Sequence, residues 1–262
     1  IGGFVVLFLF VNYSGFTSLM SELTNNKVFK GLNNNQLKII AMISMLIDHI
    51  GVAFFPGVRI FRCLGRLAFP IYAYMIAEGC RYTKNRKRYF GMMAAMAVVF
   101  QVVYFVFMNS LYQGILVNFA LSIAAIFAID SFIKNKRIIN RILTASIVLA
   151  VLFISTVLPI TLGEYGFSID YGLYGLCLPI LVYFAPNKKW GLIFTSILLT
   201  VMSITSGVYY QLLSLLTIPL FILYNGERGN KKLKYVFYLF YPIHLVLIYA
   251  IMFLLTILKT HT

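Results

Sequence analysis

The sequence predicts an all-α fold, a polytopic bundle of transmembrane helices, and three observations support this prediction. Of the 262 residues, 61% are hydrophobic and only 11% are charged. The mean hydropathy is +0.90. Soluble domains contain roughly 45–50% apolar residues, so a soluble fold is excluded. The apolar residues also form runs of about 20, the length of a helix that crosses a bilayer.

Nine apolar runs follow one another along the chain, separated by turn residues such as Pro56-Gly57 and Asn225-Gly226. These expected core spans cover residues 37–55, 64–80, 89–108, 113–133, 140–158, 171–186, 190–206, 209–224 and 236–258. The sixth, seventh and eighth runs are short or closely spaced, so re-entrant or tilted segments stay open as alternatives. We therefore expect about nine spans, with a margin of one.

We divide the chain into an N-terminal apolar segment with a cytoplasmic linker, residues 1–36, and a single transmembrane domain, residues 37–258. Residues 1–20 are compatible with a further span, a signal-like segment or an interfacial helix. Little length is left for an aqueous catalytic domain. Any chemistry must therefore use helix side chains and short loops.

The net charge of +15 is carried by short basic clusters between the apolar runs. These clusters occupy alternate loops, which predicts that those loops lie on the cytoplasmic side of the cell membrane. Because membrane orientation accounts for the charge, nucleic-acid binding is not expected. One loop, after the first run, breaks the alternation because it carries Arg59 and Arg62. The three cysteines form no CxxC pair, so neither a metal site nor a disulfide framework is predicted.

The first run contains two ionisable residues near its middle, Asp48 and His49. Such residues are costly in a membrane unless they face the bundle interior or a water-filled cavity, which favours a functional site over a purely structural pair. Adjacent helical residues point about 100° apart, so each of the two needs a partner elsewhere. We expect Arg66 to pair with Asp48; an interfacial arginine that snorkels to the membrane surface is the alternative.

Other polar residues fall within the runs. Gln101, Asn118 and Tyr171 are expected in the outer half of the bundle, and His244 roughly 13 Å from the cytoplasmic side. Gln101 and Asn118 are also compatible with simple hydrogen bonds between helices. His244 follows Pro242, which loosens the helix backbone and favours a position that lines a cavity.

Several of these residues belong to motifs that stand in a fixed order along the chain. The motifs are Ile47-Asp48-His49-Ile50-Gly51, Gly65-Arg66-Leu67-Ala68-Phe69-Pro70, Gln101, Asn118, Tyr171-Gly172-Leu173-Tyr174-Gly175 and Tyr241-Pro242-Ile243-His244. From about Leu37 to Ile257 the chain resembles the TraX family, which is named for a conjugative-pilus protein that N-acetylates pilin. The resemblance implies an integral-membrane acyltransferase that uses acetyl-CoA or another acyl-CoA and acylates an amine or hydroxyl.

Within that interpretation we favour His49 as the general base, since an imidazole has an ordinary pKa near the operating pH. His244 is expected near the thioester, and Asp48 orients or charge-balances the site. The expected substrate-binding residues are Arg66, Gln101, Asn118, Tyr171 and Tyr241. Arg81, Lys84 and Arg88 are expected to meet the phosphates of the donor, although a topology signal explains the same charges.

The expected partners are acyl-CoA, an acceptor peptide, sugar or lipid, and the bilayer; no oligomeric state is predicted. A proton-coupled transporter or exporter is the alternative function, with Asp48, His49 and His244 as a proton relay. A structural or assembly factor is a third class. Charge near the midplane does not separate an enzyme from a transporter, so the preference for an enzyme depends on the resemblance.

Overall fold

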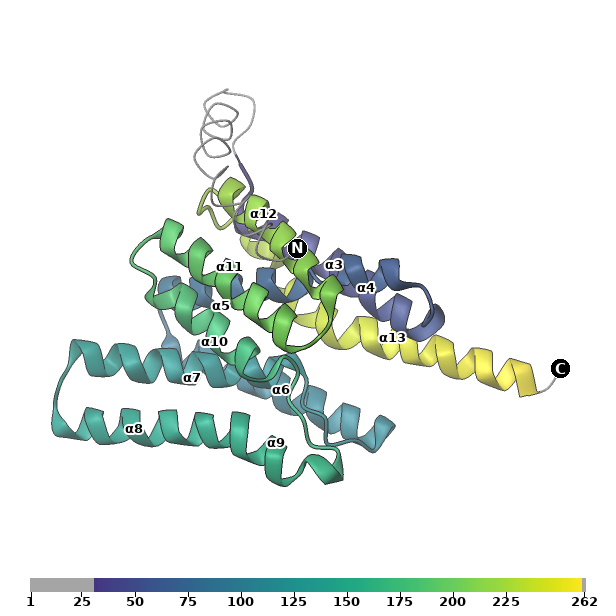
Figure 1. Ribbon diagram of the computed structural model, residues 1–262, viewed down its shortest axis with the longest axis horizontal. Coiled ribbons are helices and arrows are strands. Elements are labelled where there is room, and N and C mark those ends of the chain that lie inside the picture. The colour runs from purple at the N-terminus through teal and green to yellow at the C-terminus, as the bar shows by residue number, and fades with distance from the viewer. Residues whose placement is uncertain (1–30, 261–262) are drawn as a thin grey trace. The chain divides into compact units, whose positions relative to one another are not determined.

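The computed structural model describes residues 31–260, and all the regular structure in that range is helical. Its α-helices are α3 (Asn34–Phe54), α4 (Arg59–Gly65), α5 (Ala68–Tyr82), α6 (Arg86–Met108), α7 (Ile115–Lys134), α8 (Ile138–Leu152), α9 (Leu158–Thr161), α10 (Gly172–Phe184), α11 (Lys188–Thr205), α12 (Thr217–Leu223) and α13 (Lys234–Thr260) (Figure 1). A π-helical turn, Phe153–Val157, joins α8 to α9. A 3₁₀ segment, Tyr209–Leu216, precedes α12. The N-terminal segment 1–30 lies outside the described residues.

Each of the nine expected apolar runs coincides with helix, so the all-α transmembrane prediction is confirmed. When α4 and α5 are taken as one span, and α8 and α9 as another, the described residues contain six helices long and apolar enough to cross a membrane. Two shorter apolar helical stretches, Gly172–Phe184 and Tyr209–Leu223, coincide with the sixth and eighth runs. The count of nine spans therefore stays a prediction.

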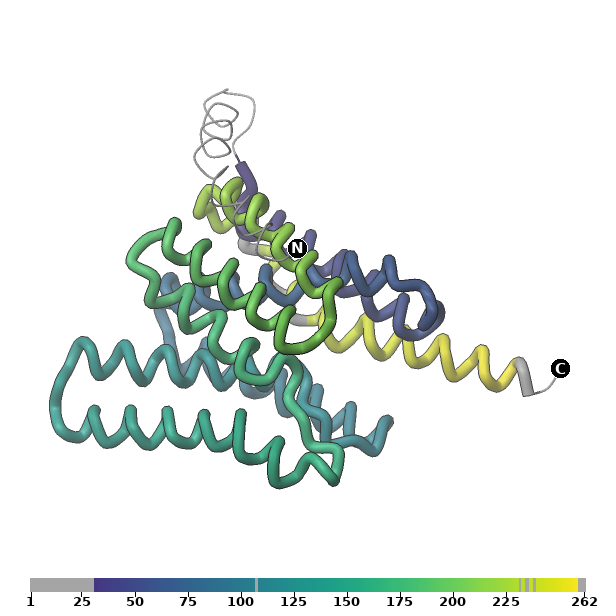
Figure 2. Tube along the Cα trace, in the orientation of Figure 1, coloured from purple at the N-terminus to yellow at the C-terminus, as the bar shows by residue number. Residues whose placement is uncertain are grey.

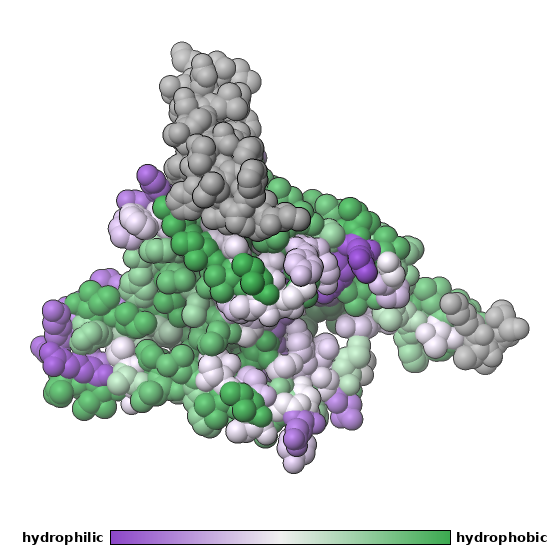
Figure 3. Space-filling view, in the orientation of Figure 1, coloured by the Kyte–Doolittle hydropathy of each residue, from purple (hydrophilic) through white to green (hydrophobic). Residues whose placement is uncertain are grey.

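Large apolar side chains lie exposed along several helices, as expected for surfaces that face lipid. On α8, Ile138, Ile142 and Leu149 are between 56% and 69% exposed. On the face shown in Figure 3, hydrophobic residues cover much of the surface and hydrophilic residues gather in small groups. Because soluble proteins rarely expose contiguous apolar surface of this kind, the bilayer is its natural solvent.

The second expected run is not one continuous helix. Helix α4 begins at Arg59 and ends at Gly65, and α5 begins at Ala68. Pro70 lies in the first turn of α5, where the N–H groups have no intrahelical partner, so the missing N–H of proline costs little there. The break leaves Arg62 on the short helix α4 and Arg66 at its C-cap.

Contacts divide the chain into two units. The first comprises residues up to Tyr72 and from Ser196 onward, and the second comprises Ala73–Thr195. In the first unit α3 packs against both α4 and α13, and α4 contacts the 3₁₀ segment before α12. Figure 2 shows α13 running alongside α3, although residues 55–233 lie between the two helices in the sequence.

The packing of α3 against α4 depends on two glycines. A Cβ atom at Gly51 would fall 2.9 Å from Cγ of Phe61, and one at Gly65 would fall 2.5 Å from Cγ of Asp48. Small residues let membrane helices approach closely, so both glycines are explained by packing. The hydroxyl of Ser44 donates to the carbonyl of Leu64 at 2.6 Å and joins the same two helices.

In the second unit α7 is the central helix, since it contacts α6, α8 and α10. Ser122 is fully buried on α7 and donates to the carbonyl of Leu176 on α10 at 2.9 Å. At the C-terminal end of the same helix, Asp130 pairs with Arg86 and with Lys134, the latter at 2.9 Å. Polar contacts partway along α7 and near its C-terminal end therefore stabilise this bundle.

Candidate functional site

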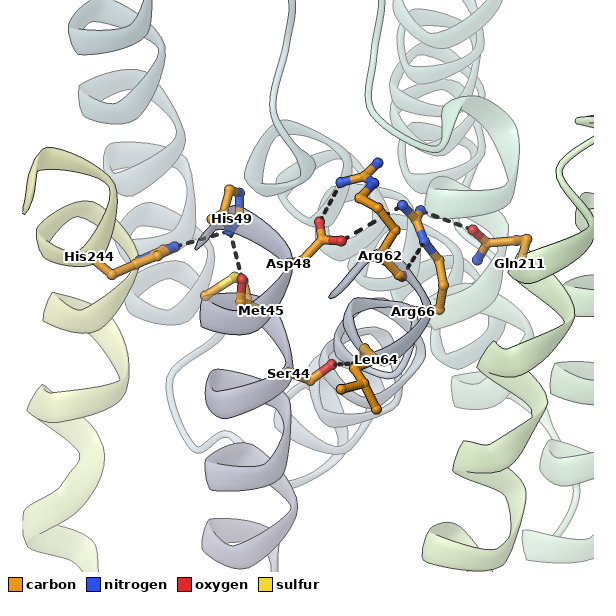
Figure 4. Close-up of polar contacts among 9 residues, drawn as sticks. All are labelled: Ser44, Met45, Asp48, His49, Arg62, Leu64, Arg66, Gln211 and His244. Atoms are coloured by element: carbon orange, nitrogen blue, oxygen red, sulfur yellow. Dashed lines mark hydrogen bonds and ion pairs between the residues drawn. The ribbon is translucent and has the colours of Figure 1, made fainter. Parts of the chain in front are cut away.

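Asp48 and His49 lie in the fourth turn of α3 and point away from one another (Figure 4). Asp48 faces α4, where it meets two arginines, and His49 faces α13, where it meets His244. This divergence is what the helical rotation of about 100° per residue requires.

His49 and His244 form a close pair. Nδ1 of His49 lies 3.4 Å from Nε2 of His244, and the ring centroids lie 5.0 Å apart with an edge-to-face geometry. His244 is only 4% exposed, and its ring stacks on Phe240 at 4.8 Å. Tyr241 contacts the same imidazole edge-on at 5.8 Å. Three aromatic neighbours therefore hold His244 in place.

Backbone carbonyls define the tautomers of the pair. Nδ1 of His49 lies 2.8 Å from the carbonyl oxygen of Met45, and Nδ1 of His244 lies 2.7 Å from that of Phe240. A carbonyl only accepts hydrogen bonds, so we assign the proton of each neutral ring to Nδ1. The Nδ1–H of His49 is then shared between Met45 and the lone pair of His244 Nε2. Nε2 of His49 is left as a basic nitrogen.

Asp48 lies among the side chains of α4. Nη1 of Arg62 donates to Oδ2 of Asp48 at 2.7 Å, and Nη2 of Arg66 lies 3.9 Å from Oδ1. Arg66 is the buried member of the group, at 8% exposed. The expected pairing of Asp48 with Arg66 is therefore present, but Arg62 makes the shorter contact.

Arg66 is held from the opposite side by the segment before α12. Its Nη1 donates to Oε1 of Gln211 at 3.0 Å, and its guanidinium lies over the ring of Tyr210 at 5.3 Å. Its Nε donates to the carbonyl of Arg62 at 3.2 Å. These contacts fix the plane of the guanidinium, so an interfacial arginine that snorkels to solvent is not what the structure shows.

The other expected substrate-binding residues lie in the second unit, and their described contacts are with backbone groups of that unit. Nε2 of Gln101 donates to the carbonyl of Tyr112 at 2.9 Å. Nδ2 of Asn118 donates to the carbonyls of Asp170 and Gly172, the latter at 3.0 Å. These bonds join α6 and α7 to neighbouring loops, which is the interhelical role left open by the sequence.

Tyr171 has a backbone role of its own at the start of α10. It adopts a left-handed conformation with φ of 59°, directly before Gly172 with φ of 46°. A non-glycine residue seldom occupies this region, so the turn is strained at this position. Its part in substrate binding stays a prediction.

The three basic residues expected to meet the donor differ in how they are engaged. Arg81 pairs with Glu78 at 3.0 Å and donates to the carbonyls of Val182 and Tyr183 at the end of α10. Lys84 and Arg88 are exposed. Arg81 therefore has a structural role in the second unit, whereas Lys84 and Arg88 present their charges to solvent.

Two residues of the site, Arg62 and Gln211, were not predicted from the sequence. Arg62 carried a signal, because its loop broke the alternation of basic loops, but that exception was not connected to Asp48. Gln211 lies 145 positions from Arg66, near the start of the eighth expected run, and only the fold brings them together. Within residues 31–260, no group of three His, Cys, Asp or Glu side chains is placed to hold a metal ion.

The fold and this polar layer define a polytopic α-helical membrane protein with an ionisable site inside its transmembrane domain. The family model for the TraX protein matches residues 33–252, and the chain belongs to the TraX family. The chain is 26% identical over 241 residues to "Probable fimbrial assembly protein FimC, serogroup H1" of Dichelobacter nodosus, with 81% of this chain and 93% of the relative covered.

A second relative is "Uncharacterized protein RP591" of Rickettsia prowazekii (strain Madrid E). It is 26% identical over 178 residues, which cover 68% of this chain and 65% of the relative. No solved structure matches the chain significantly.

Proposed function

We propose that this TraX-family protein is an integral-membrane acyltransferase, which moves an acetyl or other acyl group from acyl-CoA to an amine or hydroxyl of an acceptor. The observation that carries the proposal is the contact between His49 and His244 at 3.4 Å. A histidine whose Nδ1–H is oriented by acceptors and whose Nε2 is free to take a proton has the arrangement of a general base. Because one relative is named a fimbrial assembly protein, a fimbrial peptide is a candidate acceptor, beside sugars and lipids.

In this mechanism Nε2 of His49 removes a proton from the acceptor amine or hydroxyl as that group attacks the thioester carbonyl. The bond from the acceptor to the acyl carbon forms, the carbon–sulfur bond breaks, and the imidazolium returns its proton to the departing thiolate. The products are the acylated acceptor and CoA. No oxidant, reductant or metal is needed, because the transfer only exchanges the acyl group and a proton.

His244 acts through His49. When His49 gains a proton on Nε2, its Nδ1–H strengthens its bonds to two acceptors, the carbonyl of Met45 and Nε2 of His244. Asp48 lies on the neighbouring position of α3 and supplies negative charge within the same turn. Tyr241, beside His244, is the polar residue of α13 best placed to contact a substrate at the pair.

We further propose that Lys84 and Arg88 attract the phosphates of acyl-CoA at the cytoplasmic surface of the cell membrane. Their exposure and the basic character of their loop support this role. The roles proposed from sequence for Gln101, Asn118 and Tyr171 rest on the motif order alone.

The same polar layer supports one alternative, a proton-coupled transporter. The contact between two imidazoles beside an ion-paired aspartate is also the arrangement of a proton relay. A transporter moves its substrate across sealed vesicles in response to a proton gradient and consumes no acyl-CoA, and this difference separates the two functions.

The test is transfer of label from acetyl-CoA in membranes that contain the wild-type protein, His49→Ala or His244→Ala, with mass spectrometry of the labelled product. Thr256→Ala is a matched control, since Thr256 is an exposed polar residue of α13 that donates only to its own helix. Label that appears with the wild type and the control but not with His49→Ala supports the enzyme and identifies its acceptor. Equal labelling in all four preparations, or none with acetyl and longer acyl donors, contradicts the proposal.

A further inference from the structure

The charges around Asp48 do not balance. Within the described part of the first unit, Asp48 is the one acidic side chain inside a helix, and it faces two guanidinium groups. Arg62 makes the close ion pair, while the buried Arg66 is 3.9 Å from the remaining carboxylate oxygen. Two guanidinium groups facing one carboxylate leave a net positive charge, which is costly within a membrane-spanning segment, so this cluster favours a further negative charge.

A second observation concerns Gln211. Its side chain is almost fully buried, at 4% exposed, and its amide faces Arg66 (Figure 4). Because Oε1 accepts from Arg66, Nε2 is fixed as the donor, and that atom has no hydrogen-bond partner among the described residues. Buried donors without partners are rare in native proteins, and this one adjoins the excess positive charge.

We infer that Arg62, Arg66 and Gln211 form a binding site for an oxyanion, a phosphate or carboxylate group carried by the substrate. Such a group supplies the missing negative charge and accepts the hydrogen bond that Gln211 offers. A guanidinium held in a fixed plane donates to an oxyanion in a defined direction, and Tyr210 and the carbonyl of Arg62 fix the plane of Arg66. The inference rests on the proposed function, because it assigns the anion to one of the two substrates.

The oxyanion belongs either to CoA, which carries phosphates, or to the acceptor. In both cases the chemistry of the site is the same. Asp48, which faces the cluster, and His49, the proposed base, are adjacent residues of α3 whose side chains point to different neighbours. The site is thus a specificity element: it selects a substrate that bears a negative charge.

The first measurement is the thermal unfolding midpoint, Tm, of the purified full-length chain in neutral detergent, with inorganic phosphate exchanged for chloride at constant ionic strength. At about ten times the Kd, binding to the folded state is expected to raise the Tm by about 3–6 °C. Arg59→Gln should show the same rise, because Arg59 is an exposed arginine of α4 outside the cluster.

Gln211→Glu is the informative variant. Its carboxylate takes the place of the anion beside Arg66, so the protein should fold and lose the response to phosphate. If the glutamate variant does not fold, Gln211→Leu replaces it in the test. This variant removes the donor without adding charge and should reduce the phosphate affinity several-fold. A wild-type Tm that responds equally to phosphate and chloride overturns the inference, as does a full phosphate response in both Gln211 variants.

The source of the anion follows from the same assay with CoA as the probe. A Tm rise with CoA that disappears in Gln211→Glu assigns the oxyanion to the donor. A CoA response that is absent, or unchanged by Gln211→Glu while the phosphate response is lost, assigns it to the acceptor.

Release of CoA from acetyl-CoA, measured on the same preparations, separates this inference from the proposed function. If phosphate binding fails while His49-dependent release persists, the oxyanion site is wrong and the transferase stands. If phosphate binding holds and no His49-dependent release occurs, the site stands and the transferase is wrong.

Discussion

Gly65 on α4 lies directly against the side chain of Asp48 on α3, with no room for a Cβ atom between them. Gly65→Ala should therefore displace the carboxylate from Arg62 and separate the two helices. We expect a loss of stability of about 1–3 kcal/mol, typical of an overpacked site, and a larger loss of acyl transfer than the folded fraction explains. Tm and CoA release measured together test this prediction.

Gly57→Ala is the control for that variant, because a Cβ atom at Gly57 meets nothing within 4 Å. It should leave both stability and activity near the wild-type values. If Gly65→Ala behaves as Gly57→Ala does, the close approach of α3 to α4 is not required.

The pairing of His49 with His244 predicts that their contributions are not additive. His49→Ala should reduce the rate of transfer about 10²–10⁴-fold, the usual range for loss of a general base. His244→Ala should reduce it less, since His244 positions His49. The double variant should be no slower than His49→Ala, because residues that act as a unit lose their effect together.

Rates of label transfer at saturating acetyl-CoA, for the wild type and the three variants, complete this double-mutant cycle. Independent, multiplicative losses would mean that the two histidines serve separate steps. A His244→Ala variant slower than His49→Ala would reverse their roles.

The ion pair of Arg62 with Asp48 predicts that substitutions of the two residues are not additive. Arg62→Gln removes the 2.7 Å partner and leaves Asp48 with Arg66 at 3.9 Å, so we expect a stability loss of about 1–3 kcal/mol. Asp48→Asn removes the carboxylate that faces both guanidinium groups, so it should lower the Tm further. The double variant should be about as stable as Asp48→Asn alone, because the pair with Arg62 is already lost, and a further drop in its Tm would contradict this account.

The class of fold was predictable because hydrophobic length is a local property. The apolar runs identified α3 and α13 within a few residues of their observed ends. The break between α4 and α5 was not predicted, because the residues around it are apolar enough to continue a single helix. At the end of α4, Gly65 packs against Asp48, a tertiary contact that the sequence does not show.

The site was predictable only in part, for the same reason. Asp48, His49 and His244 were identified because ionisable residues are conspicuous within apolar runs. Their partners depend on tertiary structure: His49 and His244 are 195 positions apart, and Gln211 lies outside the most apolar part of its run. Arg62 was interpreted as a loop charge, since its distance from Asp48 depends on a helix boundary that the sequence does not reveal.

Asn118 provides a test between structural and substrate-binding roles. It is fully buried, and its amide joins α7 to the carbonyls of Asp170 and Gly172 before α10. Asn118→Ala should lower stability by roughly 2–4 kcal/mol, because it leaves these carbonyls without their donor. Asn140→Ala removes an exposed hydrogen bond from a side-chain amide to the carbonyl of Asn135, and should lower stability far less. Activity per folded molecule that falls only in Asn118→Ala would assign it to substrate binding.

The basic residues before and at the start of α6 have two different expected roles: Arg81 stabilises the fold, and Lys84 and Arg88 attract acyl-CoA. Arg81 holds Glu78 and the last turn of α10, so Arg81→Gln should lower the Tm and reduce activity through folding. Lys84→Gln with Arg88→Gln should leave the Tm unchanged and raise the KM for acyl-CoA several-fold at constant kcat, the pattern of lost uniform binding.

Because exposed charges are screened by salt, the wild-type KM for acyl-CoA should rise with salt concentration and approach that of the double variant. Arg141→Gln, an exposed charge of another basic loop, should change neither quantity. If it raises the KM equally, the attraction of acyl-CoA reflects the net positive surface and not Lys84 and Arg88.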